Sequence, residues 1–149
     1  SVQIQFSLLA PDLGKQYQVK KICDENNIDF FAYSPLSFGI LCIDPDKEQN
    51  KEKSFIRNAL FENYKKPTYE LRRCLKRIAN QRSVSQAQVA INWCCYQGTI
   101  PLVGMRKKSQ VIDVSNVFKW NLNKNEFKVL QEVSKKCLKK MPKNPFSSN

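Results

Sequence analysis

The chain has 149 residues, 42% of them apolar, which is the composition of a globular protein of at most one ordinary domain. It contains no histidine, which excludes imidazole acid–base chemistry and the commonest metal ligand. Its formal net charge of +12 favours an anionic partner, either a nucleotide, a nucleic acid or a membrane surface. A solvated basic surface would give the same composition.

The six cysteines form no CxxC pair, so we predict no metal site. No apolar run has transmembrane length and no signal peptide is recognisable, so we predict reduced thiols and a cytoplasmic protein. An organellar location is the alternative, because the sequence opens inside an element without an initiator methionine and we expect protein upstream of it.

The first third of the chain predicts two strands around a helix. Residues 2–6 alternate apolar and polar, as a strand does, and residues 15–26 have helical spacing. Residues 28–33 are almost wholly apolar, which indicates a strand buried on both faces. The polar residues 42–54 have no period and predict an exposed loop or a mobile lid.

Helices dominate the middle of the chain. Helical spacing covers residues 54–64 and 68–80. Ser85 and Gln88 have the spacing of a capping box and predict a helix that begins there and ends at Gly98.

The last third predicts one more strand and two helices. Residues 99–103 form another strand of the buried type, and helices begin near Ser109 and at Asn123, which is capped by Glu126. Residues 142–149 are basic and contain proline, and we expect a flexible tail after a domain that covers residues 1–141.

The order of the elements is typical of parallel βαβ units in an α/β fold. Three strands cannot close a barrel, so the sequence predicts part of a larger domain. In such folds ligands bind beyond the carboxyl ends of the strands, where residues 33–39 and 104–110 are expected. Gly104 and Arg106 suit a phosphate there, and Tyr33 and Ser34 suit a flat ring and its polar substituents.

The same residues also fit simpler roles, a solvated turn for the cationic segment and a core aromatic followed by a turn for Tyr33 and Ser34. The cations are not interleaved with aromatics as in nucleic-acid-binding motifs, so we predict neither a nucleic-acid partner nor a membrane partner. No catalytic set can be assembled, since histidine is absent and the carboxylates form no pair suited to glycoside hydrolysis.

Five blocks in order resemble the aldo-keto reductases: VQIQFSLL, CDENNIDFFAYSPLSFGIL, LFENY, SVSQAQVAINWCCYQGTIPLVG and QVIDV. The similarity is greatest to the branch that contains potassium-channel β subunits and plant and microbial aldo-keto reductases. It implies a TIM (β/α)₈ barrel that binds NADP(H) without a Rossmann domain, of which this chain would be the C-terminal portion, about the last three βα units. A barrel of this kind needs about 250 residues.

The resemblance implies roles for nine residues in binding NADP(H). They are Gln3 at the nicotinamide carboxamide, Tyr33 stacked on the nicotinamide ring, Ser34, Leu36 and Ser37 along the pyrophosphate, Gly104, Arg106 and Gln110 at the 2′-phosphate, and Asp113 at the adenine. The sequence departs from the family at three places: Val2 and Val114 stand where it has asparagine, and Cys42-Ile43-Asp44 stands where it has Thr-Gly-Lys. Arg57 is a candidate to substitute for a family arginine over the pyrophosphate.

The family's catalytic Asp, Tyr, Lys and His come from the first four strands, which have no counterpart here, so we assign no catalytic residue. The resemblance implies reduction of aldehydes or ketones to alcohols by hydride transfer, with a small carbonyl substrate and the missing N-terminal half of the barrel as partners. We expect this chain alone to be inactive. The alternative is a noncatalytic subunit that uses the fold for protein interaction or redox sensing.

Overall fold

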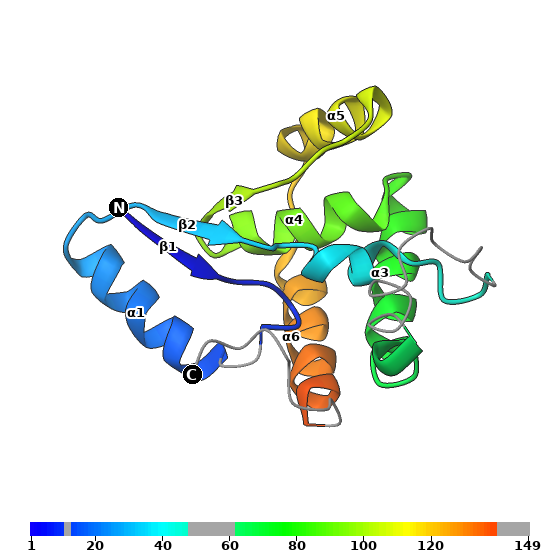
Figure 1. Ribbon diagram of the computed structural model, residues 1–149, viewed down its shortest axis with the longest axis horizontal. Coiled ribbons are helices and arrows are strands. Elements are labelled where there is room, and N and C mark those ends of the chain that lie inside the picture. The colour runs from blue at the N-terminus through cyan, green and yellow to red at the C-terminus, as the bar shows by residue number, and fades with distance from the viewer. Residues whose placement is uncertain (11–12, 48–61, 140–149) are drawn as a thin grey trace.

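The computed structural model describes residues 1–10, 13–47 and 62–139 (Figure 1). It has three parallel strands in the order β1-β2-β3: β1 (Val2–Gln5), β2 (Phe30–Tyr33) and β3 (Ile100–Leu102). The helices are α1 (Leu13–Glu25), η1 (Ser37–Cys42), α3 (Tyr69–Arg82), α4 (Gln86–Tyr96), α5 (Lys108–Ser115), η2 (Asn116–Lys119) and α6 (Lys124–Leu138). The predicted α/β rhythm of parallel strands separated by helices is confirmed.

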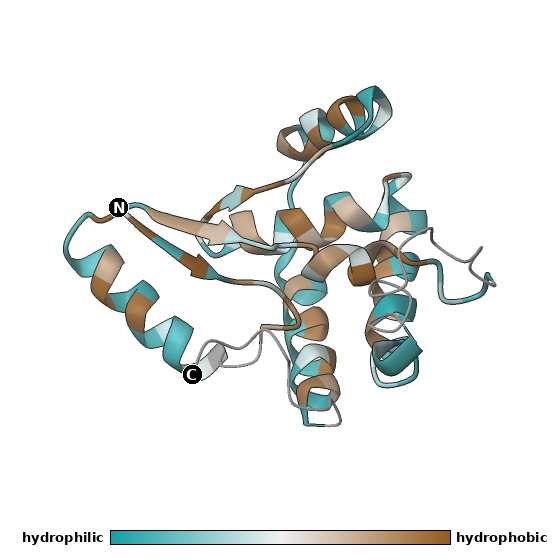
Figure 2. Ribbon diagram, viewed as in Figure 1, coloured by the Kyte–Doolittle hydropathy of each residue, from teal (hydrophilic) through white to brown (hydrophobic). Residues whose placement is uncertain are grey.

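One face of the sheet carries the core. Phe30 and Ala32 of β2 are buried, and the ring of Phe6, at the end of β1, lies 5.4 Å from that of Phe30 and 5.4 Å from that of Trp93. Trp93 belongs to α4, and apolar residues recur along the helices around it (Figure 2). Burial of these large aromatics is the main stabilising term for the fold.

The other face of the sheet is exposed or half-buried in the described structure. Side chains alternate along a strand, so residues that are paired across the sheet share a face. Gln5, Tyr33 and Leu102 are aligned in this way. Tyr33 is 41% exposed and Leu102 39%, so the prediction of strands buried on both faces is wrong. The described helices supply apolar cover to one face only.

The helix caps are mostly as predicted. Asn123 accepts a hydrogen bond from the backbone N–H of Glu126, and Glu126 accepts one from that of Asn123, which completes a capping box. Ser85 accepts from the N–H of Gln88, but the reciprocal half is absent from the described contacts. The predicted capping box at Ser85 is therefore only half correct, because the Gln88 side chain binds elsewhere.

Several sequence predictions fall outside the described residues. These are most of the helix over 54–64, the end of the loop over 42–54, the tail over 142–149 and the role of Arg57. Of the cysteines, Cys23, Cys74, Cys94 and Cys137 are buried, as expected of core residues. Within the ranges that are described, no helix has both the length and the apolar character needed to span a bilayer.

Candidate functional site

The parallel strands bring three chain segments to one edge of the sheet, where their carboxyl ends lie. The first begins at Phe6, after β1. The second, the β2 segment, covers residues 34–47, and the third, the β3 segment, covers residues 103–115. All residues that the resemblance assigns to the cofactor lie on these segments or on the strands that precede them.

Gln3 and Tyr33 lie on the exposed face of the sheet. Gln3 of β1 is paired with Phe31 of β2, and Tyr33 is two residues after Phe31 in β2. The side chains of Gln3 and Tyr33 therefore project to the same side of the sheet. Gln3 is exposed, and the 41% exposed ring of Tyr33 is available to stack on a flat partner. The amide of Gln3 can both donate and accept hydrogen bonds.

The backbone of the β2 segment turns tightly directly after Tyr33. Ser34, Ser37 and Phe38 have φ values of 53°, 48° and 58°, and Gly39 has a φ of 93°. The carbonyl oxygen of Ser34 accepts a hydrogen bond of 3.0 Å from the N–H of Ser37. Three left-handed residues other than glycine in five positions cost free energy, and such strain is concentrated at functional sites.

Ser37 uses its hydroxyl inside the protein. Its Oγ lies 2.8 Å from Oγ of Ser7, and both residues are buried. Ser7 also accepts a hydrogen bond from the N–H of Leu9, so the segments after β1 and β2 are joined. Leu36, half-buried against the core, accepts a hydrogen bond at its carbonyl from the N–H of Gly39. Ser37 and Leu36 thus shape the turn.

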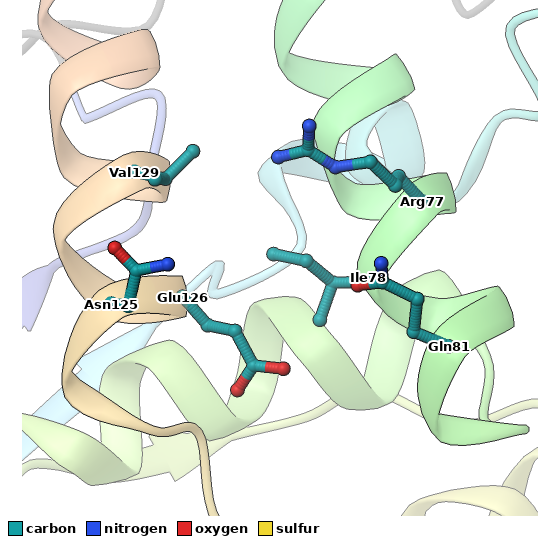
Figure 3. A pocket seen from close by; sticks show the side chains of 6 residues that line it. All are labelled: Arg77, Ile78, Gln81, Asn125, Glu126 and Val129. Carbon is teal, nitrogen blue, oxygen red and sulfur yellow. The ribbon is translucent and has the colours of Figure 1, made fainter.

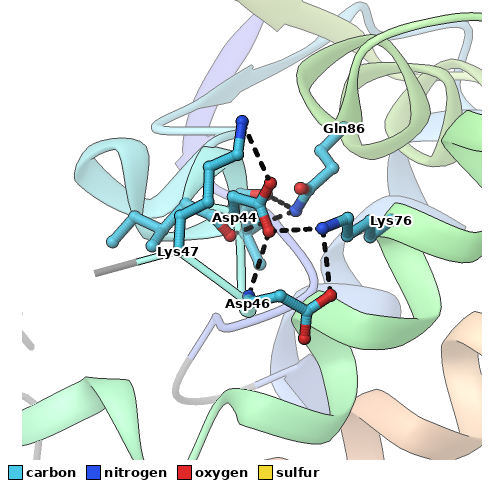
Figure 4. A network of polar contacts seen from close by, with 7 residues as sticks. Asp44, Asp46, Lys47, Lys76 and Gln86 are labelled. Carbon is cyan, nitrogen blue, oxygen red and sulfur yellow. Dashed lines mark hydrogen bonds and ion pairs between the residues drawn. The ribbon is translucent and has the colours of Figure 1, made fainter. Parts of the chain in front are cut away.

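Ion pairs hold the far end of the β2 segment against α3 (Figure 4). Lys76 of α3 donates to Asp44 at 2.6 Å and to Asp46 at 2.9 Å. The hydrogen bond from Lys76 is the main cause of the lowered pKa of Asp44. Gln86, the first residue of α4, donates to the carbonyl oxygens of Leu41 and Ile43, each at 3.3 Å. Asp44, at the position where the resemblance implies a lysine, is therefore paired with a cation of the protein itself.

The β3 segment is exposed and cationic. Arg106, Lys107 and Lys108 are exposed, and a Cβ added at Gly104 would meet no atom within 4 Å. The protein's own packing therefore does not require glycine at this position, whereas close approach of a ligand would. Gln110 accepts hydrogen bonds from the N–H groups of Arg106 and Lys107, at 2.8 and 3.0 Å, and holds the backbone there in a turn.

Asp113 joins α5 to the start of α4. Its two carboxylate oxygens accept hydrogen bonds from Oγ of Ser85 and from Nε2 of Gln88, each at 2.6 Å. Gln88 in turn accepts a hydrogen bond from Nε1 of Trp120 at 3.1 Å. The sequence did not predict this network, because a helix cap is enough to explain the spacing of Ser85 and Gln88.

The chemistry of the edge fits a dinucleotide with phosphate groups. It offers an exposed aromatic ring and an amide on the sheet face, and a cationic turn at the start of a helix, where the helix dipole favours an anion. Among the described residues no cluster of carboxylates and cysteines suits a metal ion. A separate groove of about 230 Å³ lies between α3 and α6, lined by Arg77, Gln81, Asn125 and Glu126 among others (Figure 3).

Comparison with known proteins agrees with this geometry. The model of the aldo/keto reductase family matches residues 1–135. Pyridoxal reductase, a chloroplastic protein of Arabidopsis thaliana, is 36% identical over 149 residues, which are 99% of this chain and 40% of the relative.

Solved structures share the fold. A glycerol dehydrogenase from Gluconobacter oxydans superimposes with a TM-score of 0.71 at 23% identity, over 99% of this chain and 45% of its own. An aldo-keto reductase in complex with NADPH gives a TM-score of 0.59 at 17% identity, over 88% of this chain and 34% of its own.

The chain belongs to the aldo/keto reductase family, and its three βα units are the C-terminal part of a (β/α)₈ barrel. It spans 40% of the length of the Arabidopsis relative. The exposed sheet face that carries Gln3 and Tyr33 is accordingly the face that looks into the barrel.

Proposed function

We propose that the complete protein is an NADP(H)-dependent oxidoreductase that interconverts an aldehyde or ketone and its alcohol, and that this chain supplies the cofactor-binding side. The observation that carries the proposal is the common edge of the sheet: the exposed ring of Tyr33 and the cationic turn at Arg106 follow neighbouring parallel strands. Membership of the family and the NADPH complex of a protein with the same fold support it.

The assigned residues form groups that would act on different parts of the cofactor, which supplies the hydride when bound. Tyr33 stacks on the nicotinamide ring and the amide of Gln3 holds its carboxamide. The carbonyl substrate would lie on the side of the sheet that carries Gln3 and Tyr33. The proton for the carbonyl oxygen has to come from the catalytic residues that the family places in its first four strands.

The charge distribution favours NADP over NAD in this proposal. Arg106 is exposed and can offer two parallel N–H donors to a phosphate, which is the geometry of strong guanidinium–phosphate pairs. The β2 segment, by contrast, has Asp44 where the family has lysine, and Lys76 is already paired with it. We therefore assign most of the phosphate affinity to the 2′-phosphate and to Gly104, Arg106 and Gln110.

Pyridoxal is the first carbonyl substrate to test, because the relative that is 36% identical to this chain over 149 residues is a pyridoxal reductase. A cytoplasmic location stays a prediction, since that relative is chloroplastic. A redox-sensing role gains no support from Cys74, Cys94 and Cys95, because burial raises the pKa of each thiol and suppresses the reactive thiolate.

The test is made on the complete protein. We expect NADPH to quench its tryptophan fluorescence more strongly than NADH does at equal concentration, and NADPH to be consumed when pyridoxal or another aldehyde is added. Absence of NADPH binding would overturn the cofactor assignments. NADPH binding without turnover of any aldehyde or ketone, in a protein whose upstream half lacks the catalytic tyrosine and lysine, would favour the noncatalytic alternative.

A further inference from the structure

Helix α5 has few attachments to the rest of the described structure. None of its eight residues is buried, and in Figure 1 it stands apart from the other helices. Its C-terminal end continues into η2, where Val117 is buried and its carbonyl oxygen accepts a hydrogen bond from Asn92 of α4. Toward the same end of α5, Asp113 accepts hydrogen bonds from Ser85, the N-cap of α4, and from Gln88 of α4.

A chain of side-chain hydrogen bonds runs from Trp120 to Asp113, and helix α5 connects Asp113 to the cationic turn. Trp120 donates to Gln88, Gln88 donates to Asp113, and Asp113 lies one turn of α5 beyond Gln110. Gln110 holds the backbone N–H groups of Arg106 and Lys107. A shift of Asp113 would therefore move the whole turn, because α5 has no buried residue of its own to resist it.

The orientation of the Gln88 amide is determined by its partners. The indole N–H of Trp120 can only donate, so the oxygen of the Gln88 side chain must face it. The Gln88 NH₂ group then faces Asp113, whose ionised carboxylate can only accept. Gln88 is 5% exposed and lies on α4, outside the β2 and β3 segments, and it contacts the β3 segment at Asp113.

We propose that Gln88 is a positioning residue for the 2′-phosphate site, and that Asp113 connects it to the cationic turn instead of binding the adenine. This inference rests on the proposed function. Each carboxylate oxygen of Asp113 already accepts a short hydrogen bond from α4, and the residue is half-buried between the two helices. The contact with α4 orients α5 and so sets where Arg106 meets the phosphate.

Two substitutions that exchange the hydrogen-bond donor and acceptor between positions 88 and 113 test the proposal in the complete protein. Gln88→Glu keeps an acceptor for Trp120 but sets a second carboxylate against Asp113, which repels it. We expect NADPH affinity to fall roughly tenfold, with NADH affinity changed less than twofold, because only the 2′-phosphate is displaced. Adding Asp113→Asn supplies a donor to the new carboxylate and keeps an acceptor for Ser85, so NADPH affinity should return to within about threefold of wild type.

Gln86→Glu is the matched control, since it makes the same chemical change on the same turn of α4. Gln86 donates to carbonyl oxygens of the β2 segment, which serves both cofactors, so NADPH and NADH should weaken by the same factor. Circular dichroism of each variant confirms that it is folded.

The outcomes separate this inference from the proposed function. If the wild-type protein binds no NADPH, both fail. If it binds NADPH but Asp113→Asn does not rescue Gln88→Glu, or if Gln88→Glu weakens NADPH and NADH equally, the positioning role is wrong and the cofactor proposal stands. A loss caused by Asp113→Asn that is unaffected by the residue at 88 would instead indicate direct contact with the adenine.

Discussion

The two segments that follow β2 and β3 are built in opposite ways. The β2 segment buries Ile40, Leu41 and Ile43 and has three left-handed residues other than glycine. Hydrogen bonds and ion pairs tie it to Ser7, after β1, and to α3 and α4. The β3 segment is exposed from residue 104 to residue 112, cationic, and attached to α4 at Asp113.

Under the proposed function, this difference would separate two tasks in cofactor binding. A segment with a rigid backbone and paired charges suits the parts that NADPH and NADH share, namely the nicotinamide and the pyrophosphate. An exposed segment with unburied cations suits the 2′-phosphate, which only NADPH carries. We therefore expect substitutions in the β2 segment to affect both cofactors alike and substitutions in the β3 segment to change the preference between them.

Arg106→Ala should have the largest effect. Loss of a bidentate guanidinium–phosphate contact is expected to weaken NADPH binding roughly 100-fold in the complete protein and leave NADH binding within about twofold. Fluorescence titration with both cofactors measures this. Lys108→Ala, which removes a neighbouring exposed cation, is the control and should change NADPH affinity by no more than about twofold. Equal losses for the two variants would mean that general charge attracts the cofactor.

Tyr33→Ala should weaken NADPH and NADH to the same extent, roughly tenfold, because the aromatic ring would stack on the nicotinamide that both contain. Tyr33→Phe keeps the ring and should bind both cofactors nearly as well as wild type. A loss confined to NADPH would contradict the assignment of the end of β2 and the segment after it to the shared parts of the cofactor.

Ser37→Ala tests whether the β2 segment depends on its internal hydrogen bonds. The substitution leaves the buried hydroxyl of Ser7 without the Ser37 partner, so the free energy of unfolding should fall by about 1–2 kcal/mol. Urea denaturation of the complete protein measures the loss. Ser115→Ala removes an exposed hydroxyl on α5 and should stay within about 0.5 kcal/mol of wild type. A similar loss in both variants would remove the contrast between the segments.

Asp44→Asn should have the smallest effect, and that effect depends on pH. The hydrogen bond from Lys76 lowers the pKa of Asp44 below its ordinary value of 3.8, so the folded protein prefers the ionised form. The stabilisation is fully present above that ordinary pKa and is lost as the pH falls through the lower pKa of the folded state. The difference in unfolding free energy between wild type and variant should therefore shrink below about pH 4. A difference that grows on acidification would refute the pairing with Lys76.

Local signals in the sequence predicted much of the fold. The alternation from Val2 to Phe6 predicted a strand, and the structure has β1 over Val2–Gln5, with Val2 and Ile4 packed against the core. The capping box at Asn123 and Glu126 was correct because all of its partners lie within three residues. The family resemblance identified the barrel, and the family match over residues 1–135 confirmed it.

Local signals in the sequence did not predict which side chains are buried or which polar groups meet over long sequence distances. The apolar run of β2 predicted burial on both faces, but whether an apolar side chain is covered depends on which elements pack over it. Tyr33 and Leu102 are exposed because the described helices cover the opposite face. The nine cofactor assignments stay predictions, and the structure adds that Ser37 and Asp113 already have partners within the protein.

The sequence by itself determined which segments form helices and strands, because periodicity and caps act over a few residues, and its motifs identified the family. Only the tertiary structure decided where the side chain of Gln88 goes. Its spacing from Ser85 satisfies a capping box, yet its amide binds Asp113, 25 residues away, and the indole of Trp120, 32 residues away. A buried amide takes the partners that can satisfy both its oxygen and its nitrogen, and folding brings those partners together.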